Sequence, residues 1–375
     1  KGARYAWESS IEGKEESAGW QYADHEIHIT ADVIYALWHY YCQTDDWEFM
    51  KQYGIEMLVE TARYWVERVD VNPVNQSINL LGVMGPDEYL PFTKNNAYTN
   101  WMVKFSLAKT LQMLEHFESK NPKEFCRKMA VLNLKPFEIE QFRQVMVGLT
   151  IPIDHSRNLV MQSEDFGNYA DIDFDQIWMD RSRPFGHFIS QEKNYRSKAL
   201  KQADVLMLMY LLPGDFTNEQ MKRAYEYYEP LTTHDSSLSA TIYAIVATWL
   251  GKRTEAETYF QKALKIDLDL GKKGCEEGIH IANAGGLWQS VIHGFAGIPN
   301  VIQSDILTIN PRLPKNWQRI RFHLKWKGKV VGIEISKEHI VIINQSQEPI
   351  KVIVKDRLIL VKASETKTVG YTMNI

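Results

Sequence analysis

Apolar side chains recur every three or four residues through much of the chain before residue 300. This spacing is clear over 47–69 and over 97–117, where it predicts two long helices. Residues 31–43 are more continuously apolar and predict a largely buried helix with Thr30 as its N-cap. Further helices are predicted over 123–147, 197–212, 217–228, 236–250, 254–266 and 285–294. With no strand pattern before residue 300, this succession predicts an all-α first domain.

A different pattern begins after Gly297-Ile298-Pro299. Residues 320–326 alternate apolar and polar side chains, and Lys327-Gly328 then predicts a turn. Short β-branched segments follow at 330–335, 340–343, 350–354 and 358–361. These segments predict a small antiparallel sheet domain, so we expect a helical domain over 1–300 and a sheet domain over 301–375. Charge changes at the same point, with a net +7 over 301–375 and −11 before it.

Composition narrows the classes of partner. Aromatic residues make up 12% of the chain, with 11 Trp and 18 Tyr, which offers flat surfaces suited to sugar rings. The net charge of −4 argues against nucleic acid and anionic membranes as partners. Three widely spaced cysteines, Cys42, Cys126 and Cys275, form no disulfide framework and favour a reducing, cytoplasmic compartment. No signal peptide or bilayer-long apolar run is found, and the chain begins at Lys1 rather than Met, as expected of a fragment.

The loop around Asp87 and Glu88 is the strongest candidate for chemistry. Neighbouring residues point apart, so we expect only one of the two carboxylates to face a ligand. An Asp-Glu pair in a loop is most often a solvated turn. Here Gly85-Pro86 before the pair and Tyr89 after it indicate a shaped loop. An acid among aromatic or apolar groups can act as a general acid, and cleavage of a glycosidic bond needs such a proton donor.

A hydroxyl-rich turn precedes the helix predicted over 236–250. It contains His234, Ser236 and Ser237. Serines at a helix start are usually N-caps. The same arrangement is also an anion site for phosphate or carboxylate, to which His280 could add a second imidazole.

Other polar residues stand among apolar or aromatic neighbours. Lys201-Gln202 would usually be a solvated helix end, and the His of Glu26-Ile27-His28 would usually be structural. Near a site, Lys201, Gln202, Trp7 and Glu8 would suit sugar hydroxyls. The 150–196 segment is irregular, which is typical of a functional loop. No metal-binding HExxH, phosphate-binding P-loop, dinucleotide loop or GxSxG elbow is present, and no metal is expected.

Seven motifs in order along the chain carry a family resemblance. They are Gly2-Ala3-Arg4-Tyr5-Ala6-Trp7-Glu8-Ser9, Glu26-Ile27-His28-Ile29-Thr30-Ala31-Asp32, Gly85-Pro86-Asp87-Glu88-Tyr89, Asn95-Asn96-Ala97-Tyr98-Thr99-Asn100, Lys201-Gln202-Ala203-Asp204, His234-Asp235-Ser236-Ser237-Leu238-Ser239 and Gly278-Ile279-His280. Together they resemble the family 65 glycoside hydrolases and phosphorylases, which include maltose, trehalose, kojibiose and nigerose phosphorylases. The resemblance implies an (α/α)6 barrel followed by a small C-terminal β domain.

The resemblance also implies roles for particular residues. Glu88 would be the general acid, and Lys201 and Gln202 would bind glucose in the donor subsite. His234, Ser236 and Ser237 would bind phosphate, and Trp7, Glu8 and His280 would line the site.

Two features depart from the family pattern. The N-terminal β-sandwich, the first barrel helices and a Phe-Trp-Asp glucose-binding motif are not found, so we expect the barrel to be incomplete at its N-terminus. Residues 90–94 differ from the usual acceptor-side sequence, so the acceptor is not specified.

The leading hypothesis is therefore an inverting α-glucoside phosphorylase. Inorganic phosphate would be its co-substrate, with no cofactor, and a homodimer is expected from the resemblance. A hydrolase of the same family is an alternative, with Asp235 or Glu229 as the base that activates water. A second alternative is a non-catalytic carbohydrate-binding module.

Overall fold

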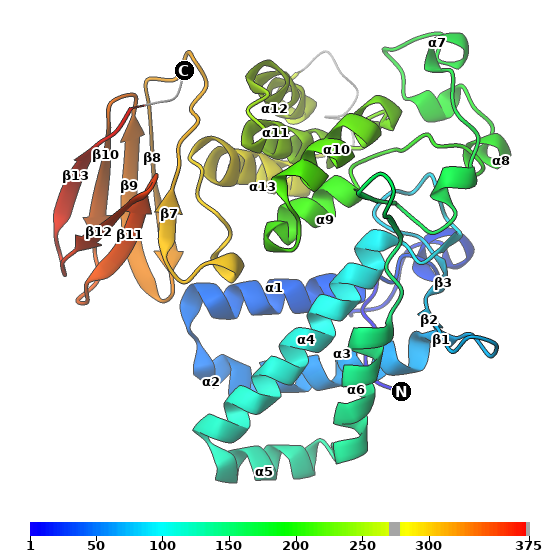
Figure 1. Cartoon of the computed structure of the whole chain (residues 1–375), viewed down its shortest axis with the longest axis horizontal. Helices are drawn as coiled ribbons and strands as arrows, with labels where there is room; N and C mark the ends of the chain where they lie inside the picture. Colours follow the sequence, from blue (N-terminus) through cyan, green and yellow to red (C-terminus); the bar gives the residue numbers. More distant parts are fainter. Residues whose placement is uncertain (270–277, 373–375) are drawn as a thin grey trace. The chain divides into compact units, whose positions relative to one another are not determined.

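The computed structural model describes residues 1–269 and 278–372, and the contacts divide the chain into two compact units (Figure 1). The first unit consists of Lys1–Trp38, Trp47–Leu208 and Tyr227–Thr233. The second unit consists of the described parts of His39–Asp46, Met209–Glu226 and His234–Ile375.

Three long helices that pack on one another form the base of the first unit (Figure 1). They are α3 (Ile55–Arg68), α4 (Ala97–Lys120) and α6 (Pro136–Gly148). On α3 the apolar stripe from Leu58 to Trp65 is buried, so the periodic positions of the sequence form the packed face.

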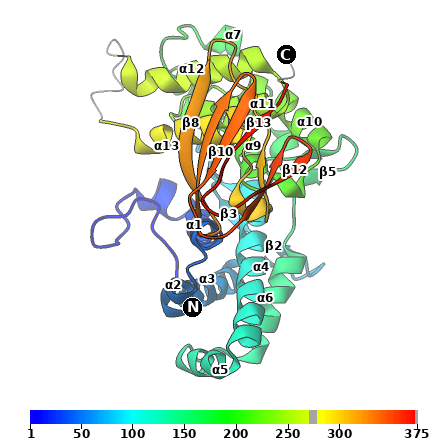
Figure 2. The same cartoon turned by 90° about the vertical axis from the view of Figure 1, so that its left-hand side faces the viewer.

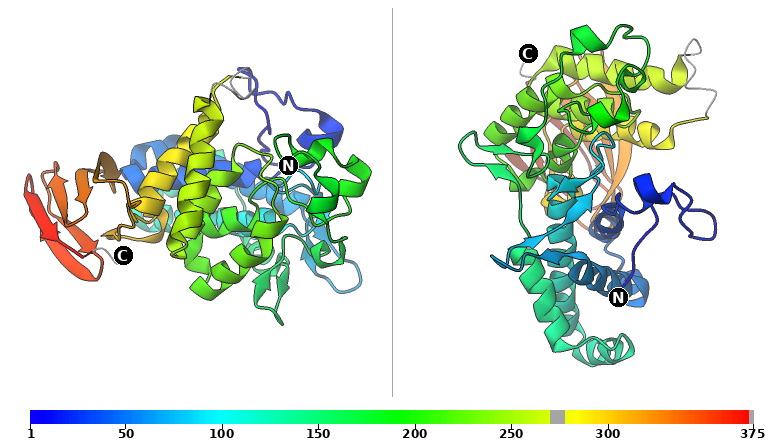
Figure 3. Two further views of the ribbon diagram at one scale, coloured as in Figure 1. Left: turned by 90° about the horizontal axis from the view of Figure 1, so that it is seen from above. Right: turned by 90° about the vertical axis from the view of Figure 1, so that its right-hand side faces the viewer.

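Shorter helices complete this part of the unit. They are α1 (Ile29–Thr44), which continues into the second unit, α2 (Trp47–Phe49) with a π-turn over Met50–Gly54, and α5 (Pro122–Val131). The right panel of Figure 3 shows α4, α5 and α6 from another side. The helices predicted over 31–43, 47–69, 97–117 and 123–147 are confirmed.

Thr30 does not act as the N-cap of α1. The helix begins at Ile29, so Thr30 already lies within it. Its hydroxyl accepts a hydrogen bond from the backbone N–H of Tyr5 at 3.1 Å. The side chain therefore holds the N-terminal segment instead of capping the helix.

The prediction of no strand before residue 300 was wrong. The described part of the first unit contains six short strands: β1 (Asp70–Val71), β2 (Ile78–Asn79), β3 (Leu81–Val83), β4 (Thr93–Lys94), β5 (Ile153–Asp154) and β6 (Leu159–Val160). Each has two or three residues, which is too few for an alternating pattern to appear in the sequence. β3 and β4 pair antiparallel and carry the loop 84–92 between them.

The segment predicted to be irregular, 150–196, is largely so. Besides β5 and β6, it contains only short helical turns in the structure described: Phe166–Asn168, α7 (Phe174–Ile177), Phe185–His187 and α8 (Gln191–Asn194).

The helix predicted over 197–212 is shorter than expected, because α9 covers only Val205–Leu211. Residues 197–204 form a loop instead. The backbone N–H groups of Lys201 and Gln202 donate to the Asp87 side chain, not to preceding carbonyls.

The helices of the second unit pack around α11. They are α10 (Asn218–Tyr228), whose last two residues belong to the first unit, α11 (Ser239–Trp249), α12 (Arg253–Leu268) and α13 (Ile281–Gln289), which continues as a π-helix over Ser290–Phe295. The left panel of Figure 3 shows α11 and α12 in yellow-green. Residues 239–248 of α11 are all buried, because α12, α13 and the π-helix contact α11. The helices predicted over 217–228, 236–250, 254–266 and 285–294 are confirmed, with α13 beginning earlier.

Two sheets follow the helices in the second unit (Figure 2). The larger has the order β13-β10-β9-β8 and is antiparallel, with β8 (Arg319–Trp326), β9 (Lys329–Ser336), β10 (His339–Asn344) and β13 (Thr366–Gly370). The smaller has the order β12-β11-β7, with β7 (Leu307–Ile309) parallel to β11 (Ile350–Val354) and β12 (Arg357–Val361) antiparallel to it. The alternating segment 320–326, the four β-branched segments and the turn at Lys327-Gly328 are confirmed, while β7 and β13 were not predicted.

The predicted fold class is confirmed: the chain is mainly helical and ends in a small, mostly antiparallel sheet region. The domain boundary near residue 300 stays a prediction. Among the described cysteines, Cys42 and Cys126 form no disulfide, and Cys275 lies outside the described residues. Within the described residues, no helix has both the length and the apolar character needed to cross a lipid bilayer.

Candidate active site

The loop between β3 and β4 directs its two carboxylates differently, as their adjacency predicts. The side chain of Glu88 is 20% exposed, whereas Asp87 is completely buried. Asp87 Oδ1 accepts hydrogen bonds from the backbone N–H groups of Lys201 at 2.5 Å and Gln202 at 3.3 Å. Only Glu88 is therefore available to a ligand.

Glu88 and Lys201 form an ion pair. Glu88 Oε2 lies 2.8 Å from Lys201 Nζ, and the Lys201 side chain is 25% exposed. Gln202 belongs to the same loop, and its side-chain amide donates a hydrogen bond to the backbone carbonyl of Pro86. The structure thus brings together three of the predicted site residues, Glu88, Lys201 and Gln202.

Two buried carboxyl groups lie behind this cluster. Burial raises the pKa of Asp87 well above its usual range, and the nearby Asp204 carboxyl raises it further. Burial also raises the pKa of Asp204, to about 6, although Asn96 and Gln162 donate hydrogen bonds to it at 3.1 and 3.2 Å. The sequence reasoning assigned no role to either aspartate, although both stand inside the motifs that carried the resemblance.

Tyr22 and Glu26 also belong to the cluster. Burial raises the pKa of Tyr22, and the charges of Glu88 and Glu26 raise it further. Burial likewise raises the pKa of Glu26, which has no exposed surface and interacts electrostatically with Glu88 and Lys201. Tyr22 was missed by the sequence reasoning because it stands outside every motif. For Glu26, the sequence signals were its setting among apolar and aromatic residues and its place in the Glu26-Ile27-His28 motif.

His28 is buried between two carboxylates. Its Nδ1 lies 2.7 Å from Asp32 Oδ2, and its Nε2 lies 3.6 Å from Glu26 Oε2. Burial lowers the pKa of His28, but the two carboxylates outweigh burial and raise the pKa to about 9. The buried imidazole is therefore charged at neutral pH, which fits the structural role expected for it.

Trp7 and Glu8 border the same cluster. The Trp7 ring meets the His28 ring edge to face, with centroids 5.3 Å apart. The charge of Glu8 contributes to the raised pKa of Tyr22. Glu15 fixes this segment by accepting the backbone N–H groups of Trp7 at 2.7 Å and Glu8 at 3.0 Å.

The predicted anion-binding residues lie in the second unit, in the turn before α11. His234 has φ of 58°, a left-handed conformation that few residues other than glycine adopt. Its Nδ1 lies 2.8 Å from Oγ of Ser239, the first residue of α11. Ser236 Oγ accepts the backbone N–H of Leu238 at 3.2 Å, and Ser237 is half-buried beside it.

The imidazole of His234 is kept neutral by its surroundings. Its ring packs against Tyr243 and Tyr259, with centroids 4.7 and 5.0 Å away. Burial lowers the pKa of His234 to about 3, with a further lowering by the charge of Lys262. Its Nε2 is buried and has no hydrogen-bond partner among the described residues. A buried ring nitrogen of this kind is unusual in proteins, and an external oxygen ligand would satisfy it.

His280 is anchored at the start of α13. Its Nδ1 lies 2.7 Å from Asp267 Oδ1, and its backbone N–H donates to the same oxygen at 3.1 Å. Among the described residues, no hydrogen bond joins His280 to the His234 turn. Its participation in an anion site therefore stays a prediction.

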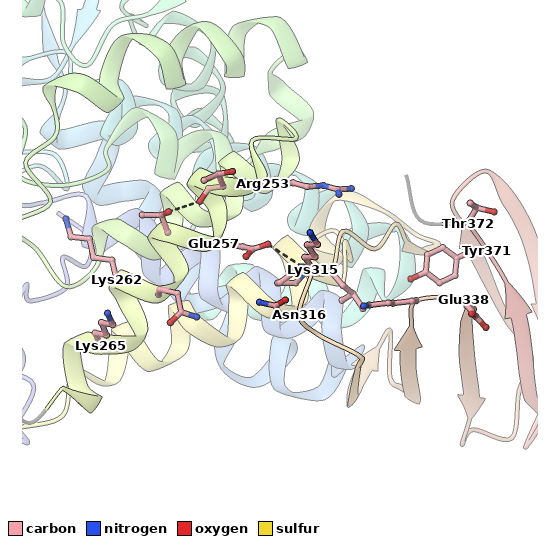
Figure 4. A pocket seen from close by; sticks show the side chains of 15 residues that line it. Arg253, Glu257, Lys262, Lys265, Lys315, Asn316, Glu338, Tyr371 and Thr372 are labelled. Atoms are coloured by element: carbon pink, nitrogen blue, oxygen red, sulfur yellow. Dashed lines mark hydrogen bonds between the residues drawn. The ribbon is translucent and has the colours of Figure 1, made fainter. Parts of the chain in front are cut away.

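A large cavity of the second unit lies elsewhere. It has a volume of about 1300 Å³ and is bordered by α12, the 313–316 loop and Tyr371 (Figure 4). None of His234, Ser236, Ser237 and His280 is among the residues that line it. In the described part of the chain, no group of three or more His, Cys, Asp or Glu side chains is arranged to hold a metal ion.

Comparison with known proteins agrees with the motifs. The model of the glycosyl hydrolase family 65 central catalytic domain matches residues 1–289, and that of the family's C-terminal domain matches residues 301–361. A kojibiose phosphorylase from Halothermothrix orenii is 36% identical, and the match covers 96% of this chain and 47% of that protein. An α,α-trehalose phosphorylase from Thermoanaerobacter brockii is 35% identical, with coverage of 98% and 47%.

A solved structure is also similar. It is described as a putative kojibiose phosphorylase from human microbiome, with a TM-score of 0.88 and 28% identity, and the match covers 98% of this chain and 53% of that one. The chain thus spans about half the length of the relatives it matches.

Proposed function

The chain belongs to glycosyl hydrolase family 65, and on that premise we propose that it carries the general acid and the phosphate-binding turn of an inverting α-glucoside phosphorylase. The observation that carries this proposal is the Glu88–Lys201 pair, 2.8 Å apart, in two loops that also share the Asp87 hydrogen bonds. Such a pair combines a proton donor with a group that binds sugar hydroxyls.

Glu88 delivers a proton to the leaving oxygen. When glucose occupies the donor subsite, its hydroxyls engage Lys201 Nζ and the Gln202 side chain. The Glu88 carboxyl is then released from its ion pair to hold a proton. As the bond between the anomeric carbon and the leaving oxygen breaks, that proton moves to the oxygen and the acceptor departs as a free sugar or alcohol. Trp7 and Glu8 line this side of the site.

Phosphate is the nucleophile and the only co-substrate, and we propose no other cofactor. One of its oxygens attacks the anomeric carbon with inversion of configuration and forms β-glucose 1-phosphate. Phosphate carries its own negative charge, so no second carboxylate is needed as a base. The Ser236 and Ser237 hydroxyls, the N–H groups at the start of α11 and Nε2 of the neutral His234 are suitable donors for it. His280 lines the same site.

The substrate class follows from the relatives. Two of the phosphorylases that the chain matches are named for kojibiose and trehalose, which are both α-linked glucose disaccharides. We therefore propose a disaccharide or a simple α-glucoside as the substrate. A cytoplasmic location and a homodimer complete the proposal, and light scattering of the full-length gene product would test the dimer.

Phosphate dependence tests the proposed reaction. The full-length gene product is incubated with α-linked glucose disaccharides, with and without phosphate, and sugar phosphate and free glucose are followed by NMR. We expect β-glucose 1-phosphate to form only with phosphate. Release of glucose at the same rate without phosphate would instead support a hydrolase with Asp235 or Glu229 as base. Sugar binding without turnover under either condition would support a non-catalytic module.

A further inference from the structure

Two loops of the first unit are joined through backbone groups. Asp87, in the loop 84–92, accepts hydrogen bonds from the N–H groups of Lys201 and Gln202, in the loop 197–204. In return, the side-chain amide of Gln202 donates to the carbonyl of Pro86. Each loop therefore satisfies polar backbone groups of the other.

A second carboxylate ties the same loops to the start of α4. Asp204 Oδ2 accepts a hydrogen bond from Nδ2 of Asn96, the N-cap of α4, at 3.1 Å. Asn96 also packs tightly against Gly85, where an added Cβ would lie 2.4 Å from its Nδ2. Asn96 is thus in contact with both loops, so neither loop is able to shift without disturbing it.

These contacts matter for function because they lie next to Glu88 and Lys201 in the sequence. Asp87 is adjacent to Glu88, and the N–H group that it holds at 2.5 Å belongs to Lys201. Buried backbone N–H groups are costly to leave unpaired, and the Asp87 side chain accepts hydrogen bonds from both of these groups. The hydrogen bonds of Asp87 therefore fix the backbone next to Glu88 and the backbone of Lys201.

We propose that Asp87 is a positioning residue, which sets Lys201 and Gln202 against the Glu88 carboxylate by holding their backbone N–H groups. It does not touch the substrate. The inference rests on the proposed function, because it concerns the geometry between the proton donor and the donor-subsite side chains. A displacement of about 1 Å in such a geometry can cost roughly 100-fold in rate.

The rival explanation is that Asp87 only stabilises the fold. Both roles predict a lower unfolding temperature when the side chain is removed, so stability does not separate them. Turnover separates them, because a purely structural residue leaves kcat of the folded enzyme unchanged. Glu138 offers a matched control. It is a buried carboxylate of α6 that binds Arg63 at 3.0 Å and accepts the Lys135 N–H at 2.9 Å.

The test compares Asp87→Ala, Asp87→Asn and Glu138→Gln in the full-length gene product. We expect Asp87→Ala to lower kcat about 100-fold and to leave KM for phosphate unchanged within roughly twofold. Asp87→Asn keeps one acceptor oxygen for the two N–H groups, so its kcat should stay within about tenfold of wild type. Glu138→Gln should lower the unfolding temperature but keep kcat within roughly twofold.

Two outcomes would overturn the proposal. One is a folded Asp87→Ala enzyme with kcat within about twofold of wild type. The other is an equal loss of kcat in Asp87→Ala and Glu138→Gln, which would make Asp87 merely structural. If Asp87→Ala does not fold, Asp87→Asn tests the proposal instead. A loss of kcat as large as that of a Glu88 variant would contradict the argument that the remaining oxygen of Asn still accepts the two N–H groups.

A second measurement keeps this proposal separate from the proposed function. Hydrogen exchange of the Lys201 and Gln202 amides needs no turnover, so it applies even if the wild-type protein makes no glucose 1-phosphate. We expect exchange at these two amides to rise at least about tenfold in Asp87→Ala and to stay near wild type in Glu138→Gln. Unchanged exchange in Asp87→Ala would refute the proposal that Asp87 holds these two amides. If exchange is faster but the wild-type protein makes no glucose 1-phosphate, only the proposed function is rejected.

Discussion

The region around Glu88 and the turn that contains His234 differ in the charge state of their buried histidines. Around Glu88, ion pairs are present: Lys201 pairs with Glu88, and His28, between Asp32 and Glu26, has its pKa raised to about 9. In the His234 turn, tyrosine rings surround the imidazole, and burial lowers its pKa to about 3. The same side chain is therefore charged in one region and neutral in the other.

The difference matches two kinds of chemistry. An ionic region that contains its own compensating charges can hold a carboxylate and a cation close together until a sugar binds. A neutral region rich in hydroxyl and N–H groups accepts an anion without first losing an internal ion pair. This contrast supports the proposal that the first region delivers the proton and the second binds the anion.

Removal of the Ser236 and Ser237 hydroxyls should distinguish the two regions most clearly. Hydrogen bonds to a charged group contribute about 1.5–3 kcal/mol, so Ser236→Ala with Ser237→Ala should raise KM for phosphate roughly 100-fold. KM for the disaccharide should change little, because these serines are proposed to bind phosphate rather than the sugar. Initial rates at varied phosphate would measure both constants. An equal rise in KM for phosphate and KM for the disaccharide would contradict the proposal that these serines bind phosphate.

Asp204 should make stability fall with rising pH. Its folded pKa is about 6, above the ordinary value of 3.8, so its favourable contribution is complete below pH about 4 and is lost as the pH rises to about 6. A shift of this size corresponds to about 3 kcal/mol. The unfolding temperature of Asp204→Asn, relative to wild type, should therefore increase between these pH values. A constant difference would show that Asp204 is not the buried acid described.

Gly85→Ala tests how closely the Glu88 loop packs on α4. The added Cβ would lie 2.4 Å from Asn96 Nδ2, and overpacking of this kind costs about 1–3 kcal/mol. We expect a lower unfolding temperature. Gly214→Ala is the matched control, because no heavy atom lies within 4 Å of a Cβ at that position. Equal effects of the two substitutions would argue against the close contact.

The two histidines provide the mildest test, because the titration is followed in the wild-type protein and substitutions serve only to assign the signals. Carbon-13 NMR of labelled imidazoles, assigned with His28→Asn and His234→Asn, should show His28 charged until the pH approaches about 9. His234 should stay neutral until the pH falls toward about 3. If both titrated near their ordinary value, the contrast between the regions would disappear.

Much of the fold could be predicted from periodicity alone. The helices around Trp65 and the strands around Ile342 follow simple spacing rules because each has a buried face. The strands β1 to β6 escaped prediction because they are too short to show a period. The start of α9 was misplaced because a distant side chain, Asp87, binds the N–H groups of Lys201 and Gln202.

The site could be predicted only in part, because it too depends on contacts between residues that are distant in the sequence. Glu88, Lys201 and Gln202 stand in motifs, and the structure brings them together. The contribution of Tyr22 depends on contacts between segments far apart in the sequence, which no local pattern reveals. The charged state of His28 and the neutral state of His234 likewise depend on their neighbours in the fold rather than on the residue type.

Glu88→Gln assayed with two donors tests the central claim most directly. A disaccharide needs a proton at its leaving oxygen, whereas α-glucosyl fluoride releases fluoride with little acid assistance. The variant of the full-length gene product should lose about 1,000-fold in phosphorolysis of the disaccharide, within the usual range for a general acid. With α-glucosyl fluoride and phosphate it should keep most of its activity. Equal losses with both donors, or no loss with the disaccharide, would contradict the assignment of Glu88 as the proton donor.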